Sequence, residues 1–341
     1  MAAVKRSLNV GMVGAGRIGS PILVNLAFKA RNSMYLQVHS RSRTKAAELV
    51  DKVQRDGAQV ACRMHDKYST MTKWCDVIIA CLKDEEAQHA VMLGRPDALL
   101  TNARRGQIIV DHTTTNVNLS RECYEVAHRR GAAYLDAALS GSLAQARSGM
   151  MTSMVGGDKA AYQRVVPIMR LYNENTHYMG GPGSGSAARA IAQSLQAMHT
   201  VAAAEAVAMA DSMGFEDVDN LLQVLDTTPG ASAMLRRHGQ TLTRLVRNPD
   251  EIPPEAASNV DSLLHDLALA RGSSTSLPDS ALPVLTTTRR AFAQASQAGV
   301  GGMDAAAVVH FLEGAAGEGN EATAASGNEP ALGEGPEIAD D

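Results

Sequence analysis

Residues 181–214 read GPGSGSAARAIAQSLQAMHTVAAAEAVAMADSMG, a glycine-rich segment followed by 27 residues, Ala187 to Met213, that contain neither glycine nor proline. Apolar side chains recur there at spacings of three and four, namely Ile191, Leu195, Met198, Ala202, Ala206, Met209 and Met213. This spacing predicts one helix with a single apolar stripe. At about 1.5 Å per residue the helix is roughly 40 Å long, so we expect it to join two domains.

The length and composition of the chain agree with two soluble domains. A chain of 341 residues exceeds what one hydrophobic core usually serves. Hydrophobic residues make up 45% of the sequence, and no run approaches the roughly 18 apolar residues of a membrane span. The net charge of -4 gives no general attraction to nucleic acid or anionic lipid. We therefore expect neither a nucleic-acid nor a membrane partner.

The N-terminus and the cysteines bear on the cellular compartment. The residues after Met1 lead into a strand-like run without the apolar region of a secretory signal. The cysteines, Cys62, Cys75, Cys81 and Cys123, show no C-x-x-C spacing and no accompanying histidine pattern. We expect no metal site, no disulfide framework and a cytoplasmic location, with an organellar location left open.

The first half of the chain alternates strand and helix patterns. Strands are predicted at Leu8–Val13, Tyr35–His39, Cys75–Leu82, Gln107–Asp111, Ala133–Leu139 and Thr152–Val155. Helices are predicted at Ile18–Lys29, Lys45–Arg55, Asp84–Met92 and Leu119–Arg130. Such alternation is typical of βαβ units and a parallel sheet covered on both faces. The fold class is therefore α/β, with a doubly wound Rossmann sheet in an N-terminal domain at residues 1–181.

The second half is helical by its periodicity. After the interdomain helix, residues 182–214, helices are predicted at Val218–Asp226, Ser232–Val246, Ser258–Arg271 and Leu282–Ala298. We expect an all-α C-terminal domain at residues 215–313. Residues 314–341, rich in Gly, Ala and Glu, are expected to form a disordered acidic tail. The long apolar stripe and the Ala-rich later helices also predict a homodimer or homotetramer.

A glycine motif follows the first strand. Residues 10–19 read VGMVGAGRIG, which places G-x-G-x-x-G between a predicted strand and a predicted helix. Gly14 permits the tight turn, Gly16 lets the backbone approach a pyrophosphate, and Gly19 allows close packing of helix on strand. A merely structural glycine turn is the alternative. The predicted dinucleotide contacts are Gly14, Ala15, Gly16, Arg17, Ile18 and Gly19, where helix N–H groups are left for phosphate.

The end of the second strand indicates which dinucleotide binds. A site for NAD needs a carboxylate there for the ribose hydroxyls, but residues 39–43 read HSRSR. Arg41 can hold a 2′-phosphate through charge-assisted hydrogen bonds, with Ser40 as a second donor. A solvated basic loop is the alternative. The residues favour NADP over NAD.

A short turn follows the strand predicted at Ala133–Leu139. Ser140-Gly141-Ser142 can offer a hydroxyl and the N–H groups of Gly141 and Ser142 to a small carboxylate substrate. From the pattern alone, an ordinary polar turn is at least as good an interpretation.

Six motifs, in order, resemble those of the β-hydroxyacid dehydrogenases over roughly residues 7–312. This family includes 3-hydroxyisobutyrate dehydrogenase and the glyoxylate and succinic semialdehyde reductases. The glycine motif is similar to the family's G-x-G-x-M-G. Ser40-Arg41-Ser42 occupies the place of its Asn-Arg-Thr, and residues 111–114, DHTT, stand for its Asp-x-Ser-Thr, which reaches the nicotinamide ribose.

Three further motifs complete the resemblance. Residues 136–142, DAALSGS, with residues 154–158, MVGGD, look like the substrate signature D-A-P-V-S-G-G and its sequel. Residues 183–189, GSGSAAR, are similar to G-x-G-x-x-x-K at the start of the interdomain helix, and residues 264–270, LHDLALA, to L-x-K-D-L-x-L-A.

The resemblance implies both the reaction and the residues that take part. It implies hydride transfer between NADP and a small hydroxy acid or semialdehyde, and a C-terminal domain of the 6-phosphogluconate dehydrogenase type. It implies a substrate site at Ser140, Gly141 and Ser142, with Arg189 and Gln193 on the interdomain helix. The further cofactor contacts that it implies are Leu82, Lys83, Thr114, His265 and Asp266.

The chain departs from the family at the catalytic position. A lysine there acts as general acid or base, supported by an asparagine one turn later, but this chain has Arg189 and Gln193. A guanidinium in practice cannot give up its proton, although it can stabilise a developing alkoxide. His265, which replaces the late lysine, and His112 are alternative proton donors. Lys83 replaces a usual proline, and Ser142 narrows the substrate turn.

Three functional interpretations follow from these residues. The first is an NADP-dependent oxidoreductase that acts on CH–OH groups. The second is a catalytically impaired member of the family that acts as an NADP-binding oligomeric scaffold, which the change to Arg189 motivates. The third is an imine-reductase-like enzyme, although such enzymes usually carry Asp or Tyr at the position of Arg189.

Overall fold

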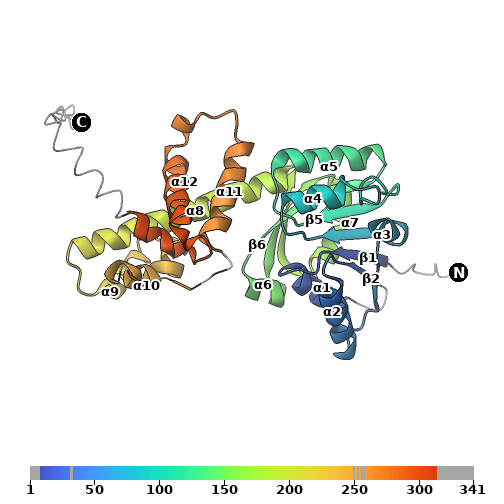
Figure 1. The fold of residues 1–341 in the computed structure, drawn as a ribbon, viewed down its shortest axis with the longest axis horizontal. Coiled ribbons are helices and arrows are strands. Elements are labelled where there is room, and N and C mark those ends of the chain that lie inside the picture. The colour runs from blue at the N-terminus through green and yellow to red at the C-terminus, as the bar shows by residue number, and fades with distance from the viewer. Residues whose placement is uncertain are drawn as a thin grey trace, which may run out of the picture. The chain divides into compact units, whose positions relative to one another are not determined.

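The computed structural model describes residues 8–312 apart from 31–33, 249, 252, 255 and 257. Within these residues, eight strands form one sheet in the order β3-β2-β1-β4-β5-β6-β7-β8. Figure 1 draws this sheet with helices beside it. The strands are β1 Leu8–Val13, β2 Met34–His39, β3 Cys62–Met64, β4 Val77–Ala80, β5 Ile108–Asp111, β6 Ala133–Ser140, β7 Met151–Gly157 and β8 Asn173–Gly180. The Rossmann sheet predicted from the sequence is confirmed.

Helices cover both faces of the sheet, because alternate residues of a strand enter different hydrophobic cores. Val10 and Met12 of β1 belong to one core, and Val13 belongs to the other. The first core also holds residues of α1 Gly19–Lys29, α2 Arg43–Arg55, α6 Leu143–Ser148 and α7 Lys159–Met169. The second core holds residues of α3 Tyr68–Trp74, α4 Glu85–Met92 and α5 Val117–Arg129.

The strand order places a switch point beside the glycine motif. β1 pairs with β2 on one side and with β4 on the other, all in parallel. In open α/β sheets, ligands bind outside the carboxyl ends of the strands at such a point. The motif at residues 14–19 therefore lies at the carboxyl ends of the strands, where a dinucleotide is expected to bind.

The sheet is not parallel throughout, which corrects the expectation. β7 pairs with β6 in the antiparallel direction, with Ser140 opposite Thr152. Only residues 141–150 join the two strands, whereas a parallel crossover needs a dozen or more residues. The chain therefore turns back directly after the substrate turn, and the short helix α6 fills the connection.

The second half is all-helical, as predicted. Its main helices are α8 Ser184–Ser212, α9 Val218–Leu225, α10 Ala233–Arg247, α11 Val260–Ser273 and α12 Pro283–Ala295. Short helical turns follow at Asp279–Ala281, Ser296–Val300 and Ala305–Val309. No helix in the described part of the chain is both long and apolar enough to cross a membrane. The acidic tail expected at 314–341 lies outside the described residues, as does residue 313.

The contacts divide the chain into two compact units. The first holds the chain up to Ala197 together with Leu263–Leu285, and the second holds Met198–Ser262 together with the chain from Thr286. The segment with Asp266 thus belongs to the same unit as the sheet. These units are defined by contacts and are not the same as the predicted domains. The domain boundaries expected after residues 181, 214 and 313 stay a prediction.

The apolar stripe found in the sequence is the exposed face of α8. Ile191, Leu195, Met209 and Met213 are each at least half exposed, between 50% and 70%. The buried face carries smaller side chains, namely Ala197, Val201, Ala203, Ala204, Val207 and Ala210. Much of the apolar surface of the stripe is therefore uncovered in a single chain.

Candidate active site

The glycine motif has the geometry of a dinucleotide loop. Gly14 has φ +93°, and a Cβ there would lie 2.2 Å from the carbonyl oxygen of Cys81. A Cβ on Gly19 would lie 1.9 Å from the carbonyl oxygen of Gly14. A Cβ on Gly16, by contrast, would meet no atom within 4 Å, so the backbone there is open to a ligand. Gly14 and Gly19 therefore lie where only a glycine fits, and Gly16 leaves the backbone accessible, as a dinucleotide loop requires.

The start of α1 leaves donors for phosphate. The residue before the helix gives no side-chain cap, and the first turn holds no acidic residue. Among the described residues, the N–H groups of Gly16, Arg17 and Ile18 have no backbone acceptor. A helix N-terminus with free N–H groups favours an anion. The loop therefore fits the pyrophosphate of a nicotinamide dinucleotide.

The basic loop after β2 contains one paired and one available arginine. Arg43 forms an ion pair with Asp66, and both side chains are mostly exposed. Arg41 is exposed, while Ser40 beside it is buried. The pKa of Asp84 is lowered by the Ala87 N–H that it accepts, and also by the charges of Lys83 and Arg41. Arg41 therefore lies within electrostatic range of the loop that follows β4.

The loops after β4 and β5 are joined at the other predicted cofactor contacts. The N–H of Leu82 donates to the Thr113 hydroxyl at 3.1 Å, and the Thr113 N–H donates to buried Asp111 at 2.9 Å. Thr114, the predicted ribose contact, follows directly and is half-buried. Lys83 points into solvent and lies 3.5 Å from Asp84.

Buried Asp111 makes further hydrogen bonds next to these loops. Its carboxylate also accepts hydrogen bonds from the Gln88 amide at 2.7 Å and from the Tyr134 hydroxyl at 2.8 Å. Burial raises the pKa of Asp111, and the donors around it act in the opposite direction. The aspartate of the expected nicotinamide-ribose motif is therefore a structural anchor, and the Thr113 hydroxyl contacts the loop that follows β4.

In the substrate turn, Ser142 is hydrogen-bonded to Gln145. Its N–H donates to the Gln145 side chain at 2.8 Å, and its hydroxyl accepts the Gln145 N–H at 3.2 Å. This capping box begins α6. The Ser142 N–H is thus engaged within the turn, and its expected role toward a substrate carboxylate stays a prediction. Ser140 ends β6, and Gly141, with φ +147°, follows as an exposed turn residue.

Arg189 is tied to the strand that carries Ser140. Its Nη1 donates to the carbonyl oxygen of Leu139 at 2.6 Å, and its Nη2 lies 3.2 Å from an Asp266 carboxylate oxygen. The Gln193 amide donates to the same oxygen at 2.9 Å. The side chains of Arg189 and Asp266 are 17% and 8% exposed, so this ion pair is largely withdrawn from solvent. The structure thus brings Arg189, Gln193, Asp266 and the Ser140 end of β6 together.

The two candidate histidines differ. His112 is buried, with Nδ1 against the Ala137 carbonyl and Nε2 2.9 Å from the Tyr172 hydroxyl. A carbonyl only accepts, so Nδ1 carries the proton and the Tyr172 hydroxyl donates to Nε2. Burial lowers the pKa of His112 to about 4. It is a structural histidine. His265, on α11 next to Asp266, is exposed.

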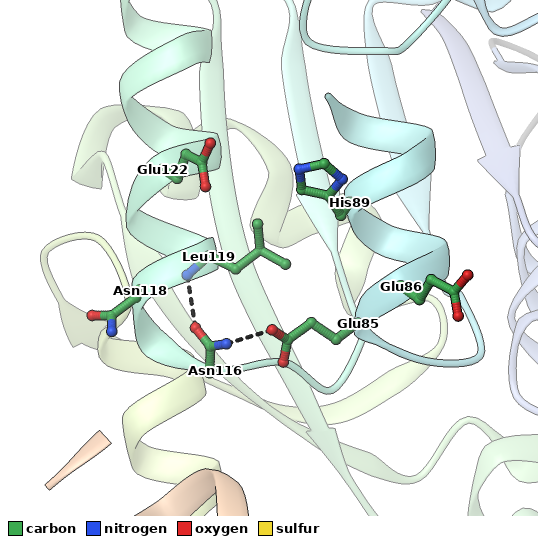
Figure 2. Close-up of a pocket in the computed structure, with 7 residues that line it drawn as sticks. All are labelled: Glu85, Glu86, His89, Asn116, Asn118, Leu119 and Glu122. Carbon is green, nitrogen blue, oxygen red and sulfur yellow. Dashed lines mark hydrogen bonds between the residues drawn. The ribbon is translucent and has the colours of Figure 1, made fainter. Parts of the chain in front are cut away.

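An acidic hollow lies between α4 and α5, and none of its lining residues is a predicted site residue. Figure 2 shows the Asn116 amide donating to Glu85 and its oxygen capping α5 at Leu119. The hollow measures about 600 Å³, and its lining residues are Glu85, Glu86, His89, Asn116, Asn118, Leu119 and Glu122. Three carboxylates make it unfavourable for an anionic substrate.

The sequence did not reveal two groups that organise the site. The carbonyl of Leu139 is a backbone acceptor, which no residue type signals. Asp136 stood within a motif but had no assigned role, although it holds the start of α8. A carboxylate inside a predicted strand, which is otherwise apolar, was the available signal.

The fold and the loop define a Rossmann protein that binds a nicotinamide dinucleotide. Residues 9–181 match the family described as the NAD binding domain of 6-phosphogluconate dehydrogenase. Residues 183–312 match the family described as the NAD-binding domain of NADP-dependent 3-hydroxyisobutyrate dehydrogenase. The chain belongs to the β-hydroxyacid dehydrogenase family of NAD(P)-binding oxidoreductases.

Individual relatives are distant. Glyoxylate/succinic semialdehyde reductase 1 of Arabidopsis thaliana is 26% identical over 306 residues, 90% of this chain and 99% of that protein. Cytokine-like nuclear factor N-PAC of Anopheles gambiae is 28% identical over 301 residues, 88% of this chain but 50% of that protein. A Mycobacterium tuberculosis 3-hydroxyisobutyrate dehydrogenase structure with L-serine shares the fold, with TM-score 0.75, 22% identity, and coverage of 89% and 99%.

Proposed function

We propose that this chain is an NADP-dependent oxidoreductase that transfers hydride between the nicotinamide and a small hydroxy acid or semialdehyde. The observation that carries the proposal is the contact between Arg189 and the carbonyl of Leu139, which places a cation at the end of the strand that holds Ser140. The relative named glyoxylate/succinic semialdehyde reductase supports the same substrate class.

In this proposal, the substrate turn binds the substrate, and Arg189 stabilises the charge that develops during the reaction. The Ser140 hydroxyl and the Gly141 backbone bind the substrate carboxylate. Arg189 stabilises negative charge on the reacting oxygen, because its guanidinium keeps its proton and has donors beyond the two already used. NADP, when bound, supplies or accepts the hydride. The proton must then come from another group, and exposed His265 is the candidate on the neighbouring helix.

The choice of NADP rests on the loop after β2. No carboxylate stands at residues 39–41, where NAD would need one, and Arg41 is exposed beside Ser40. Because Arg43 is paired with Asp66, Arg41 is the arginine available to a 2′-phosphate. The description of the second matching family as NADP-dependent supports the same choice.

A second candidate is a catalytically impaired member that binds NADP as a scaffold. Two donors of Arg189 are engaged within the chain, and Asp266 offsets its charge. A relative of similar identity is named as a nuclear factor rather than as an enzyme. In this case the dinucleotide site is retained while turnover is lost.

Turnover separates the two candidates. The native chain is given NADPH with glyoxylate, succinic semialdehyde or a cyclic imine, and NADPH oxidation and NADPH binding are both measured. We expect binding together with oxidation on an aldehyde acid. Binding without oxidation of any substrate would establish the scaffold, and oxidation only with the imine would establish the imine-reductase interpretation.

We also propose that the chain assembles as a homodimer or homotetramer. Large apolar residues of α8, among them Ile191 and Met209, are uncovered in a single chain. A second copy of this chain is the simplest cover for such a stripe. A cytoplasmic location, with all four cysteines as free thiols, belongs to the same proposal.

A further inference from the structure

Asp136 holds the start of α8 from inside the sheet. It lies on β6, four residues before Ser140, and only 2% of it is exposed. One carboxylate oxygen accepts the N–H of Gly183 and the other accepts the N–H of Ser186, each at 2.9 Å. The first N–H groups of a helix have no partner within the helix. Asp136 supplies partners for them and complements the positive end of the helix dipole.

The same contact leaves no room for side chains. A Cβ on Gly185 would lie 2.2 Å from the Asp136 carbonyl oxygen and 2.4 Å from that of Met154. A Cβ on Gly156 of β7 would lie 2.6 Å from the Asp136 carboxylate. The first turn of α8 therefore packs directly on the backbone of β6 and β7. Such a contact fixes both the position of the helix along its axis and its rotation.

The position of Arg189 follows from this anchor. Arg189 stands four residues after Gly185, so it lies on the same face of α8 one turn later. Its guanidinium reaches the carbonyl of Leu139, three residues after Asp136 on the same strand. Strand and helix are thus joined at two points, and the second point depends on the first. A shift of about 1 Å in a positioned group can cost about a hundredfold in rate.

We propose that Asp136 is a positioning residue, which sets the register of α8 against β6 and thereby places Arg189 beside Ser140. Its effect on turnover rests on the proposed function, whereas its effect on the helix does not. Asp136 contacts neither the glycine loop nor the basic loop in the described structure, so it acts on the reaction without acting on cofactor binding.

The first test is kinetic and uses Asp136→Asn, which keeps the size and removes the charge. Its amide group turns one acceptor into a donor that faces an N–H group. We expect kcat to fall at least about tenfold while the Kd for NADPH stays unchanged. The matched control is Asp217→Asn, because Asp217 also caps a helix, α9, through the Asn220 N–H, and lies outside every motif of the proposed site. This control should keep the native kcat.

A double-mutant cycle shows whether Asp136 acts through Arg189. In an Arg189→Ala background, Asp136→Asn should lower kcat no further, since the group that it positions is gone. A full additional loss in that background overturns the inference. So does a native kcat in Asp136→Asn alone, which would leave the proposed function intact.

Hydrogen exchange gives a readout that needs no turnover. Amides at the start of α8, residues 183–190, should exchange faster in Asp136→Asn than in the native chain or in Asp217→Asn. Equal exchange in the native chain and Asp136→Asn overturns the inference. If Asp136→Asn exchanges faster but the native chain turns over no substrate, the inference stands and only the proposed function is refuted. If Asp136→Asn does not fold, Gly185→Ala displaces α8 with every donor and acceptor retained, and a native kcat in that variant also overturns the inference.

Discussion

Arg189 and Asp266 form a largely buried ion pair, with 3.2 Å between guanidinium nitrogen and carboxylate oxygen. Gln193, one turn after Arg189, donates to the same oxygen at 2.9 Å. The Arg189 guanidinium is therefore fixed in place, and Asp266 partly neutralises its charge. In the proposed function, such a cation stabilises negative charge but does not exchange its proton.

Arg189→Lys should raise turnover. Burial can lower the pKa of a lysine ammonium toward neutral pH, so that a lysine can exchange its proton. A guanidinium keeps its proton under the same conditions. General acid catalysis contributes about 100-fold or more, so we expect kcat on the best aldehyde substrate to rise at least about tenfold. When kcat for NADPH oxidation is plotted against pH, the Arg189→Lys variant should also show a titration step that the native chain lacks.

Arg271→Lys is the matched control for this exchange. Arg271 pairs with Asp279 in the same unit and has no place in the proposed chemistry. Equal kcat for the native chain and Arg189→Lys would show that arginine does not limit proton transfer. An identical rise in Arg271→Lys would show that the effect is not specific to the site.

Arg41→Ala should weaken NADPH binding at least about tenfold, because it removes charge-assisted hydrogen bonds to the 2′-phosphate. The Kd for NADH, which lacks that phosphate, should not change. Arg43→Ala removes a neighbouring cation that is already paired with Asp66, so both affinities should survive it. Calorimetric titration with both dinucleotides gives the result, and an equal loss for NADH and NADPH would contradict the assignment.

The sequence predicted the elements whose apolar pattern is strong. β1 matches its prediction at Leu8–Val13, and the long helix was expected at Ala187–Met213 and found at Ser184–Ser212. β8 was missed because NENTHYMG is largely polar, which an edge strand tolerates. β3 was missed because three residues carry no pattern.

The site was predictable only where local chemistry decides it. Gly14, Gly16 and Gly19 follow from the turn itself. The role of Ser142 was readable too, since Gln145 stands three residues later, as a capping box requires. The pairing of Arg189 with Asp266 was not readable, because 77 residues separate them and only the packing of α8 with α11 brings them together.

His112 should make the fold less stable in acid. Its pKa is lowered by burial from 6.5 to about 4, so the unfolded chain binds the proton more readily than the folded one. The stabilisation is complete above pH 6.5 and is lost as the pH falls toward 4, by about 3 kcal/mol at most. In His112→Gln the urea midpoint should depend less on pH between 7 and 4.5. His265→Gln, at an exposed histidine, is the control, and equal slopes in native and His112→Gln chains would contradict the assignment.

Charges on the exposed face of α8 should break the proposed assembly. Leu195 and Met209 are 50% and 56% exposed in the single chain, and a second copy would bury them. Leu195→Glu or Met209→Glu would then lose about 1.5 kcal/mol or more of apolar burial per copy and also place a carboxylate in an apolar contact. We expect each variant to shift the mass measured by light scattering at micromolar concentration from an oligomer toward the monomer. The control is Lys52→Glu at an exposed position of α2, which reverses a charge, whereas the other two variants only add one. It should leave the mass unchanged. A monomeric native chain would refute the assembly, and native-sized oligomers of both variants would place the interface away from this face of α8.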